Sequence, residues 1–544
     1  MRLRKATAVI LAVTMMATLS GCGGSGQESG NSDSGSAAQA ETTENTETES
    51  EVGGGGEETT ADTETRDSLV VTIPGDPTTL APNGASASGY TVPQIYDQLW
   101  NLTDGELIMR VATGYEREDE THYVVTIQSG IKDTAGNEIK ASDVLYSIDL
   151  AKNGTQGYPG ATRYIDLEKC EVVDDTTLRV VLTQPCSFQM KALSMVNLVT
   201  QASYEASADG MVTTPVGSGP YVLSEYVTGS YLTLDHNPEY WDGGDPVFKH
   251  ITVNFVPEAS QRANVMLTGE SDVSCNLSYT DENALSEAEG ITFSSETNIG
   301  TYVIFYNNSS NSVCGGNLDL RKAIAYAINQ EAIIAASAGG YGEVSQCCTS
   351  RKFSDYSDSF AEISSDTDYY AYDTEAAKAA LAASGVAEGT TIKLANGGLA
   401  GQDVIAQTIQ ANLAEIGLNV EIATYPDTQG QVISNQPEDW DIAVWSWTNY
   451  PAQSGLATIN TFGTSDYFQL EGAEEEAFLE VLGVALAAGD DTLEQAMDDL
   501  MVYMYEELPV YGLFDTCNLQ ANRTDLNMVM KSQDFPLLYK WSWK

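Results

Sequence analysis

Residues 391–422 read TIKLANGGLAGQDVIAQTIQANLAEIGLNVEI, and this stretch decides the fold class. An apolar run at 391–395 precedes a segment, 403–416, whose large aliphatic residues recur at helical spacing. A second run, 418–422, then alternates apolar and polar residues, as a strand does. Gly417 stands between helix and strand, where a left-handed residue commonly ends a helix. The stretch therefore predicts a strand–helix–strand unit with parallel strands and a right-handed connection.

The same alternation of strands and helices extends along the chain from about Thr301. Helices are predicted at Leu320–Ile328 and Asp373–Ser384, and a strand at Asp439–Trp447. Before Thr301, short β-rich segments separated by turn residues predict antiparallel sheet, with one amphipathic helix near Ala141–Leu150. The predicted strands of this first part are Leu69–Ile73, His122–Ile127, Leu178–Leu182, Tyr231–Leu234 and Ile251–Phe255. The sequence thus predicts an α/β protein whose pattern changes near Thr301.

The N-terminus has the features of an export signal. Basic residues precede the apolar run Ala6–Leu19, which is shorter than the about 20 residues that span a bilayer. Cys22 follows directly after Leu19-Ser20-Gly21, a sequence that resembles the lipobox of bacterial lipoproteins. The resemblance implies that residues 1–21 are a cleaved lipoprotein signal peptide and that Cys22 is lipidated and anchors the protein to the cell membrane. An ordinary secretory signal with a chance cysteine is the alternative.

Residues 22–66 are predicted to form a disordered acidic tether. After Cys22 they are almost wholly small or polar, with no aromatic residue and a single large aliphatic residue, Val52. Such a composition cannot bury enough apolar surface to offset the entropy lost on ordering. A flexible chain of this length reaches about 35–40 Å, so we expect it to hold the folded body off the membrane.

Residues 67–544 are too many for one hydrophobic core, and two or three domains are expected. The chain carries 78 acidic and 25 basic side chains, a formal net charge of −53. Because nucleic-acid binding requires a cationic face, no nucleic-acid partner is predicted. The charge instead favours solubility and the attraction of cationic ligands.

Cysteine and histidine do not form a recognisable metal site. Of the eight cysteines, seven remain once Cys22 is assigned to lipid, and none forms a Cys-x-x-Cys motif. Cys170 and Cys186 would close a short loop if paired, although spacing does not fix the connectivity. The three histidines have no ligand-like spacing. We therefore predict no metal and no cofactor.

Signatures of catalysis are also missing. There is no His-Glu-x-x-His, no Gly-x-Ser-x-Gly and no Walker lysine after a glycine-rich loop. Ser129-Gly130-Ile131-Lys132 matches the Ser-x-x-Lys pattern of acyl-serine enzymes but lacks its companion motifs. Asp441 near Trp445 could serve a glycosidase, although a solvated acid at a strand edge explains it better. No catalytic residue is predicted, and the protein is not expected to be an enzyme.

Six short landmarks occur in a fixed order between Leu69 and the C-terminus. They are Asp76-Pro77 with Leu80 and Pro82, then Gly136–Val144, Gly217–Tyr221 with Asn237–Trp241, Gly269–Asp272, Leu320–Ile328 and Leu508–Tyr511. Any one is a weak signal. In this order and behind a lipobox, the set resembles the oligopeptide/dipeptide/nickel-binding family (family 5) of extracellular solute-binding proteins that serve ABC importers.

This resemblance implies a two-lobed periplasmic-binding-protein-like fold (type II) with an extra β-rich subdomain at about 101–210. The first lobe would comprise 67–300 with 506–544, and the second 301–505, so the chain would cross between lobes twice, as a hinge requires. The predicted change of pattern near Thr301 agrees with this division. The resemblance also implies a monomeric, non-enzymatic receptor that captures a solute between its lobes and delivers it to ABC transporter permease subunits.

The candidate ligand-binding residues are Trp445, Trp447, Asn449 and Tyr450. They follow the apolar strand Asp441–Val444, and in α/β sheets ligands gather beyond the carboxyl ends of strands. Because side chains alternate along a strand, both tryptophans are expected on one face. The alternative is that both are packed inside the second lobe.

Asn449 bears on the kind of ligand. Peptide-binding relatives carry an aspartate just before the tyrosine of a similar stretch, and its carboxylate pairs with the α-ammonium group of the peptide. A neutral amide cannot neutralise a buried cation, and an unpaired buried charge costs several kcal/mol. Either another acid holds a free amino terminus or the ligand is not a simple peptide. The family favours an oligopeptide; an oligosaccharide, whose rings suit the aromatic neighbours, is the runner-up, and a secreted hydrolase the remaining alternative.

Overall fold

The computed structural model describes residues 66–544 except for 84–88, 104–105, 156, 158, 358, 362–369, 400, 427, 449–453 and 530–535. The predicted signal peptide, the lipidation residue Cys22 and all of the predicted tether except its last residue lie outside this part of the chain. The predicted site residues Asn449 and Tyr450 also lie outside it. Within the described residues, no helix is long and apolar enough to cross a bilayer.

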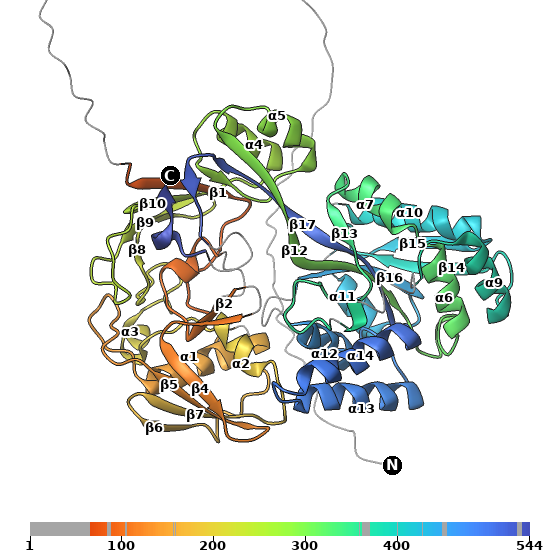
Figure 1. Cartoon of the computed structure of the whole chain (residues 1–544), viewed down its shortest axis with the longest axis horizontal. Helices are drawn as coiled ribbons and strands as arrows, with labels where there is room; N and C mark the ends of the chain where they lie inside the picture. Colours follow the sequence, from red (N-terminus) through yellow and green to blue (C-terminus); the bar gives the residue numbers. More distant parts are fainter. Residues whose placement is uncertain are drawn as a thin grey trace, which may run out of the picture. The chain divides into compact units, whose positions relative to one another are not determined.

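A mixed sheet of eleven strands runs through the described part of the chain (Figure 1). Its order is β15-β14-β16-β12-β17-β11-β1-β10-β9-β8, with β13 paired to β17. The strands are β1 (Ser68–Ile73), β8 (Tyr221–Val227), β9 (Tyr231–His236), β10 (His250–Phe255), β11 (Val273–Ser274), β12 (Ile291–Tyr306), β13 (Gly342–Val344), β14 (Thr391–Asn396), β15 (Asn419–Thr424), β16 (Ile442–Thr448) and β17 (Val510–Arg523). Neighbours in this sheet are often far apart in sequence, so its assembly depends on long-range pairing.

The predicted strand–helix–strand unit is confirmed. β14 and β15 pair in parallel over their whole length, and β14 also pairs in parallel with β16. The connecting helix α10 (Gln402–Glu415) buries its aliphatic stripe in the core that the sheet shares with its covering helices. Gly417 has a φ of 87°, a left-handed conformation that a residue with a Cβ adopts only with strain.

The other helices of this region cover the sheet around β14–β16. They are α6 (Leu318–Ala327), α7 (Gln330–Ala338), α9 (Thr374–Ser384), α11 (Gln429–Asn435), α12 (Gly455–Thr464), α13 (Ala473–Ala487) and α14 (Leu493–Glu507). α9 ends where the sequence predicts, because the Asp373 carboxylate accepts bonds from the first backbone N–H groups and Gly385 adopts a φ of 72°. The predicted helix at Leu320–Ile328 is α6, whereas the predicted strand at Asp439–Trp447 starts later, at Ile442.

The first part of the chain builds β-rich structure, as predicted. A separate antiparallel sheet has the order β4-β5-β7-β6, and two smaller sheets pair β2 with β3 and β18 with β19. The elements outside the large sheet are β2 (Trp100–Thr103), β3 (Glu106–Met109), β4 (Ala112–Arg117), β5 (His122–Ile127), α1 (Ala141–Asn153), β6 (Glu171–Asp174), β7 (Thr177–Val181), α2 (Gln189–Ala192), α3 (Gln201–Ala206), α4 (Ala259–Leu267), α5 (Glu282–Ser286), β18 (Leu526–Asn527) and β19 (Ser542–Trp543). The C-terminal Leu538 and Trp541 share a core with β1 and β10.

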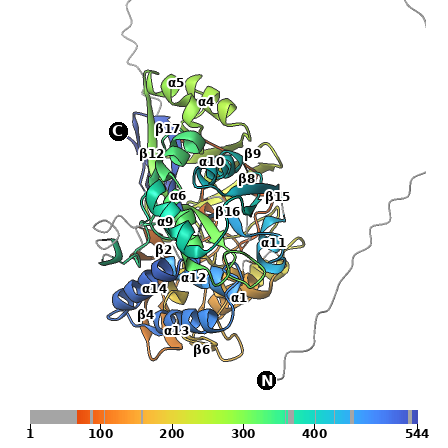
Figure 2. The same ribbon diagram turned by 90° about the vertical axis from the view of Figure 1, so that its right-hand side faces the viewer.

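Two long strands, β12 and β17, join the two parts of the large sheet. They pair antiparallel along most of their length, with register shifts at Thr297/Thr301 and Tyr302/Val303. α4 and α5 lie at one end of this pair, away from α12–α14, in both views (Figure 2). The chain therefore passes between the two parts as strands rather than as loops.

Candidate ligand-binding site

The end of β16 is the feature of the sheet that carries the predicted site residues. Ala395 of β14 lies opposite Ala443 of β16, and β14 stops one residue later at Asn396. β16 continues to Thr448, paired only with β12 on its other side. The last residues of β16 thus have one edge that no strand covers in the described part of the chain.

A cavity of about 190 Å³ occupies the space beside this edge, and we call it the β16 cavity. It is lined by Gly397, Leu399, Gln402, Tyr425, Gln429, Gly430, Trp445 and Ser446. Side chains approach two of these positions closely: a Cβ on Gly397 would displace the amide end of Gln429, and one on Gly430 would lie 3.2 Å from the Trp445 ring. The cavity lies where the carboxyl ends of parallel strands meet the first turns of α10 and α11.

Gln429 fixes one wall of the β16 cavity. Its Nε2 donates to the carbonyl of Ala395 at 3.2 Å and to that of Val444 at 2.7 Å, so its amide bridges the ends of β14 and β16. These bonds replace the strand pairing that ends with β14. They also orient the Gln429 side chain, because only the nitrogen of an amide can donate to two carbonyls.

The two predicted tryptophans lie on one face of β16. The Trp445 ring centroid lies 5.6 Å from that of Tyr467, and the Trp447 centroid 5.5 Å from that of Phe462. Both rings pack against the core yet remain partly exposed, so neither is simply a core residue. Within the described residues, each indole N–H is buried without a hydrogen-bond partner.

The sequence analysis missed Gln402, Tyr425 and Gln429. Each of them follows a strand of the parallel unit: Gln402 comes after β14, and the other two come after β15. The rule that identified Trp445, namely that ligands gather beyond strand ends, applies equally to these positions. The signal was therefore present at two further strand ends.

Asp441 is not the solvated strand-edge acid that the sequence suggested. Its side chain is buried, and its carboxylate accepts bonds from Lys393 N at 2.8 Å and Ser312 Oγ at 2.7 Å. It holds the start of β16 against β14 and the loop before α6. Asp441 is thus a structural acceptor, without the free carboxylate that a glycosidase would require.

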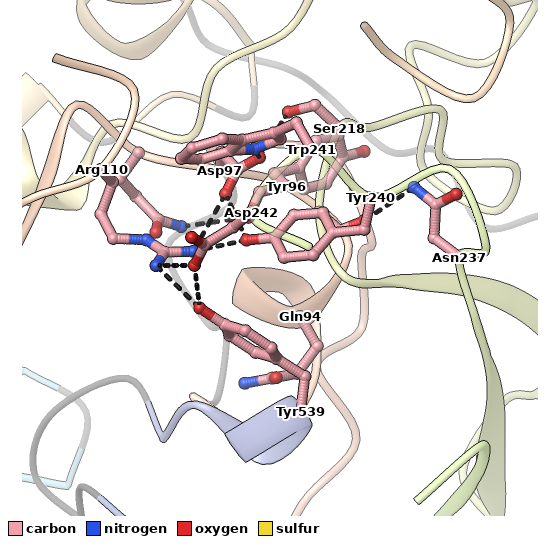
Figure 3. A network of polar contacts seen from close by, with 12 residues as sticks. Gln94, Tyr96, Asp97, Arg110, Ser218, Asn237, Tyr240, Trp241, Asp242 and Tyr539 are labelled. Atoms are coloured by element: carbon pink, nitrogen blue, oxygen red, sulfur yellow. Dashed lines mark hydrogen bonds and ion pairs between the residues drawn. The ribbon is translucent and has the colours of Figure 1, made fainter. Parts of the chain in front are cut away.

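A buried polar cluster lies elsewhere, and we call it the Asp97 cluster (Figure 3). Asp97 accepts bonds from Trp241 Nε1 at 2.7 Å and Ser218 Oγ at 3.0 Å. Burial raises the pKa of Asp97, although the nearby Arg110 guanidinium and these hydrogen bonds act to lower it. The remaining contacts of the cluster are Asp97 with Arg110 (3.5 Å) and Tyr240 (3.2 Å), Arg110 with Asp242 (3.0 Å), Tyr539 (2.8 Å) and Tyr240, and Tyr539 with Asp242 (2.6 Å). The members of this cluster satisfy one another, which marks it as structural.

A third buried acid, Asp515, lies on β17 where that strand pairs with β12. Its carboxylate accepts bonds from Thr301 Oγ1 at 2.7 Å and from Ser350 Oγ and Arg351 N, each at 3.3 Å. Burial raises the pKa of Asp515 to about 6, against these hydrogen bonds. The acid thus joins both long strands to the loop that follows β13.

Several hydrogen bonds connect the β-rich part at 101–210 with the helices α12–α14 and with the loop after β13. Tyr164 OH and the Asn460 amide contact each other at 2.8 Å, and Lys191 Nζ donates to Ser354 Oγ at 2.6 Å. Ser187 N donates to Leu486 O at 2.9 Å. The guanidinium of Arg117 donates to the carbonyls of Ala487 and Ala488. The described structure therefore has these two regions in direct contact.

Metal-binding clusters and disulfides are not found in the described residues. No group of three or more His, Cys, Asp or Glu side chains there could hold a metal ion. The seven cysteines after Cys22 are all free, so Cys170 and Cys186 do not pair in this structure.

The two-part mixed sheet, joined by two long strands, is typical of the periplasmic-binding-protein class of fold. A model of the bacterial extracellular solute-binding proteins, family 5, matches residues 106–469, and the chain belongs to this family. Its members serve ABC importers as extracytoplasmic binding proteins rather than enzymes, which confirms the predicted class and fold.

Individual relatives are more distant. The chain is 25% identical over 362 residues to the glutathione-binding protein GsiB of Salmonella typhi, covering 65% of this chain and 69% of that protein. Its structure is similar to that of a putative peptide-binding protein, AppA, from Clostridium difficile (TM-score 0.76, 18% identity, covering 88% and 100% of the two chains). It is also similar to NikA from Brucella suis in complex with Fe(III)-EDTA (TM-score 0.74, 19% identity, 88% and 100%). At these identities the solved structures support the fold alone.

Proposed function

We propose that this protein is a monomeric, lipid-anchored substrate-binding protein that captures an oligopeptide between two lobes and delivers it to the permease subunits of an ABC importer. The lobes would be 67–300 with 506–544, and 301–505, with a β-rich subdomain at about 101–210. Residues 1–21 would be the signal peptide, Cys22 the lipidated residue and 22–66 the tether. The family supports the transport role, and a relative that binds glutathione supports a peptide ligand.

The observation that supports an oligopeptide as the ligand is the uncovered edge of β16. The Val444 carbonyl, which accepts from Gln429, faces the side on which β14 lies. Because alternate residues of a strand direct their backbone groups to the same edge, the N–H and C=O of Ser446 face that side too, beyond the end of β14. An extended peptide placed there can add to the sheet through its own backbone. Trp445, Trp447, Asn449 and Tyr450 would then contact its side chains.

Identification of the bound solute tests this proposal. Native mass spectrometry of freshly purified protein, followed by calorimetry with the identified solute, should give a short peptide that is returned unchanged. A bound oligosaccharide would support the runner-up ligand within the same fold, and turnover of the solute would contradict a binding protein. Saturating peptide should also raise the melting temperature and shrink the radius of gyration, because the ligand binds the closed form preferentially.

The anchor needs a separate experiment. The Cys22→Ala variant should no longer partition into detergent, whereas the wild-type protein should, because two acyl chains hold a protein stably at a membrane. Equal partitioning of the two forms would contradict lipidation at Cys22.

A further inference from the structure

We propose that the β16 cavity is a subsite for an uncharged group of the ligand that both donates and accepts hydrogen bonds, a carboxamide or a hydroxyl, and that Gln402 sets this preference. The inference rests on the proposed function, because it assigns part of the same ligand site. It adds the chemistry of the group that the cavity receives.

The cavity is large enough for a ligand group rather than for water alone. Its volume is about 190 Å³, whereas one water molecule takes up about 30 Å³ in the liquid. It opens beside Ser446, whose backbone faces the uncovered edge of β16. A side chain projecting from a ligand that lies along this edge would therefore reach into it.

Among the described residues, no charged side chain lines the cavity: the side-chain polar groups there are two amides, a phenol, an indole and a hydroxyl. The nearest acid on α10, Asp403, is bound by Asn396 Nδ2 at 2.5 Å. A carboxylate entering this site would lose its hydration without gaining a cationic partner, which is unfavourable. The net charge of the protein, −53, would also repel it. An ammonium group would likewise lack a carboxylate among the described lining residues. The lining thus favours a neutral group.

The two amides present one donor and one acceptor. Gln402 is 1% exposed, and its Oε1 accepts bonds from Gly397 N at 3.2 Å and Leu399 N at 3.4 Å. These two N–H donors fix the oxygen, so its Nε2 is left as a donor with no acceptor among the described residues. Gln429 is the reverse case: its Nε2 is bound to two carbonyls, and no donor among the described residues binds its Oε1.

The side-chain amides of Gln402 and Gln429 both lie beside Gly397. A Cβ on Gly397 would lie 2.3 Å from Gln429 Oε1 and 2.8 Å from Gln402 Oε1, so both amides approach the backbone at that residue. A carboxamide or a hydroxyl can satisfy a donor and an acceptor together. A carboxylate can only accept and an ammonium can only donate, so each would leave one amide unpaired, which costs binding.

The variant that tests this is Gln402→Glu. The glutamate has nearly the same shape and can keep the oxygen that accepts from Gly397 and Leu399, while its second oxygen replaces the Nε2 donor. A carboxylate in the first turn of α10 also suits the helix dipole, so the variant should fold. Gln407→Glu is the matched control, because Gln407 lies exposed on the same helix.

The probes are alanine tetrapeptides that carry a single Gln, Glu, Lys or Met at each position in turn, and maltotriose as a source of hydroxyl groups. Calorimetry with the wild-type protein should show, at one position, Gln preferred over Glu, Lys and Met by about tenfold, a difference of about 1.4 kcal/mol. In Gln402→Glu the preference for Gln over Lys at that position should disappear or reverse. Gln407→Glu should keep the wild-type ratios.

The outcomes separate this inference from the proposed function. Peptides that bind without discrimination between Gln, Glu and Lys at any position would overturn the subsite and leave the oligopeptide receptor standing. Binding of maltotriose alone, weakened by Gln402→Glu but not by Gln407→Glu, would support the subsite with a hydroxyl ligand and contradict the oligopeptide. Binding of neither probe class would contradict both. Unchanged Gln and Lys affinities in Gln402→Glu would overturn the role of Gln402.

Discussion

The Asp97 cluster and the end of β16 are two polar regions of the same molecule. The buried donors of the first have hydrogen-bond partners, whereas the indole donors of the second have none among the described residues. Both bring together little-exposed polar side chains from distant segments. In the Asp97 cluster, the charged pair Asp97 and Arg110 is enclosed by hydroxyl and indole donors that all have partners. At the end of β16, the indole N–H groups of Trp445 and Trp447 have none among the described residues.

This is the difference expected between polar groups that stabilise a fold and polar groups that bind a ligand. A buried donor left unpaired costs about 1–3 kcal/mol, so folding alone does not reward it. Removing one partner from a paired buried charge costs more, because the other charge is left uncompensated. Substitutions in the Asp97 cluster should therefore change stability, whereas those at the end of β16 should change binding.

The largest effect is expected from Asp97→Ala. This change removes the buried carboxylate beside the Arg110 guanidinium, which is 6% exposed and keeps the more exposed Asp242 as a partner. It also leaves the buried donors Trp241 Nε1 and Ser218 Oγ without their acceptor. We expect the free energy of unfolding to fall by about 3–5 kcal/mol, measured by denaturant titration. The control is Asp235→Ala, which removes an exposed contact with His250 and should cost less than about 1 kcal/mol. Equal losses in the two variants would remove the distinction between the cluster and the surface.

Asp515 differs from Asp97 because it is buried with hydroxyl and N–H partners rather than in a close ion pair. We therefore expect Asp515 to make the stability of the protein depend on pH. Its pKa of about 6 in the folded state exceeds its ordinary value of 3.8, so the folded state binds the proton more tightly. Its contribution to stability is therefore full at low pH and is lost as the pH rises from about 4 to about 6, by up to about 3 kcal/mol.

The Asp515→Asn variant isolates this contribution from those of the other acids. The difference in unfolding free energy between variant and wild type, measured at several pH values, should change between about pH 4 and pH 6 and be constant above. A difference that is independent of pH would contradict the raised pKa.

A matched pair of tryptophans tests the comparison directly. Trp241→Phe removes an indole N–H that is bonded to Asp97, and should lower stability by about 1–2 kcal/mol. Trp447→Phe removes an N–H that has no partner among the described residues, so stability should change little while ligand affinity falls about fivefold. Thermal unfolding and calorimetry with the identified solute measure the two effects. A loss of stability in Trp447→Phe as large as that in Trp241→Phe would place Trp447 with the structural residues.

An effect on affinity as small as that of Trp447→Phe is expected from Tyr164→Phe. The Tyr164 hydroxyl contacts the Asn460 amide across the two regions that a hinge would separate. If this contact exists only in the closed form, its removal should lower ligand affinity by about fivefold, or about 1 kcal/mol, without changing which ligands bind. Calorimetry measures the affinity and small-angle scattering the closed fraction. An unchanged affinity would show that this bond does not depend on closure.

Much of the α/β region could be predicted because its signals are local. The stripe of α10, the alternation of β15 and the turn at Gly417 all lie within one short stretch. β12 was missed as a sixteen-residue strand, since its first ten residues, Ile291–Gly300, are largely polar and depend on β17 for their pairing. Periodicity does not reveal partners that are more than two hundred residues away.

The candidate site was predictable only in part for the same reason. Trp445 and Trp447 could be placed on one face because a strand alternates, but their neighbours Tyr467 and Phe462 come from the segment after β16. The Asp97 cluster joins residues from five separate segments, and its sequence landmark, Tyr240-Trp241, indicates a turn rather than the partners. Hydrogen-bond balance, which distinguishes the two regions, appears only when the fold is assembled.

The position of β17 in the sheet has a consequence for the order in which the protein can be completed. β17 is the last long strand of the chain, yet it lies between β12 and β11 and is the link through which the sheet is continuous. A chain that is still being made can form β14–β16 with their helices, but its earliest strand, β1, stays disconnected from them until Val510–Arg523 arrives. The large sheet can therefore be completed only at the very end of synthesis. A chain truncated after residue 509 should form two protease-sensitive parts rather than one slightly shortened protein.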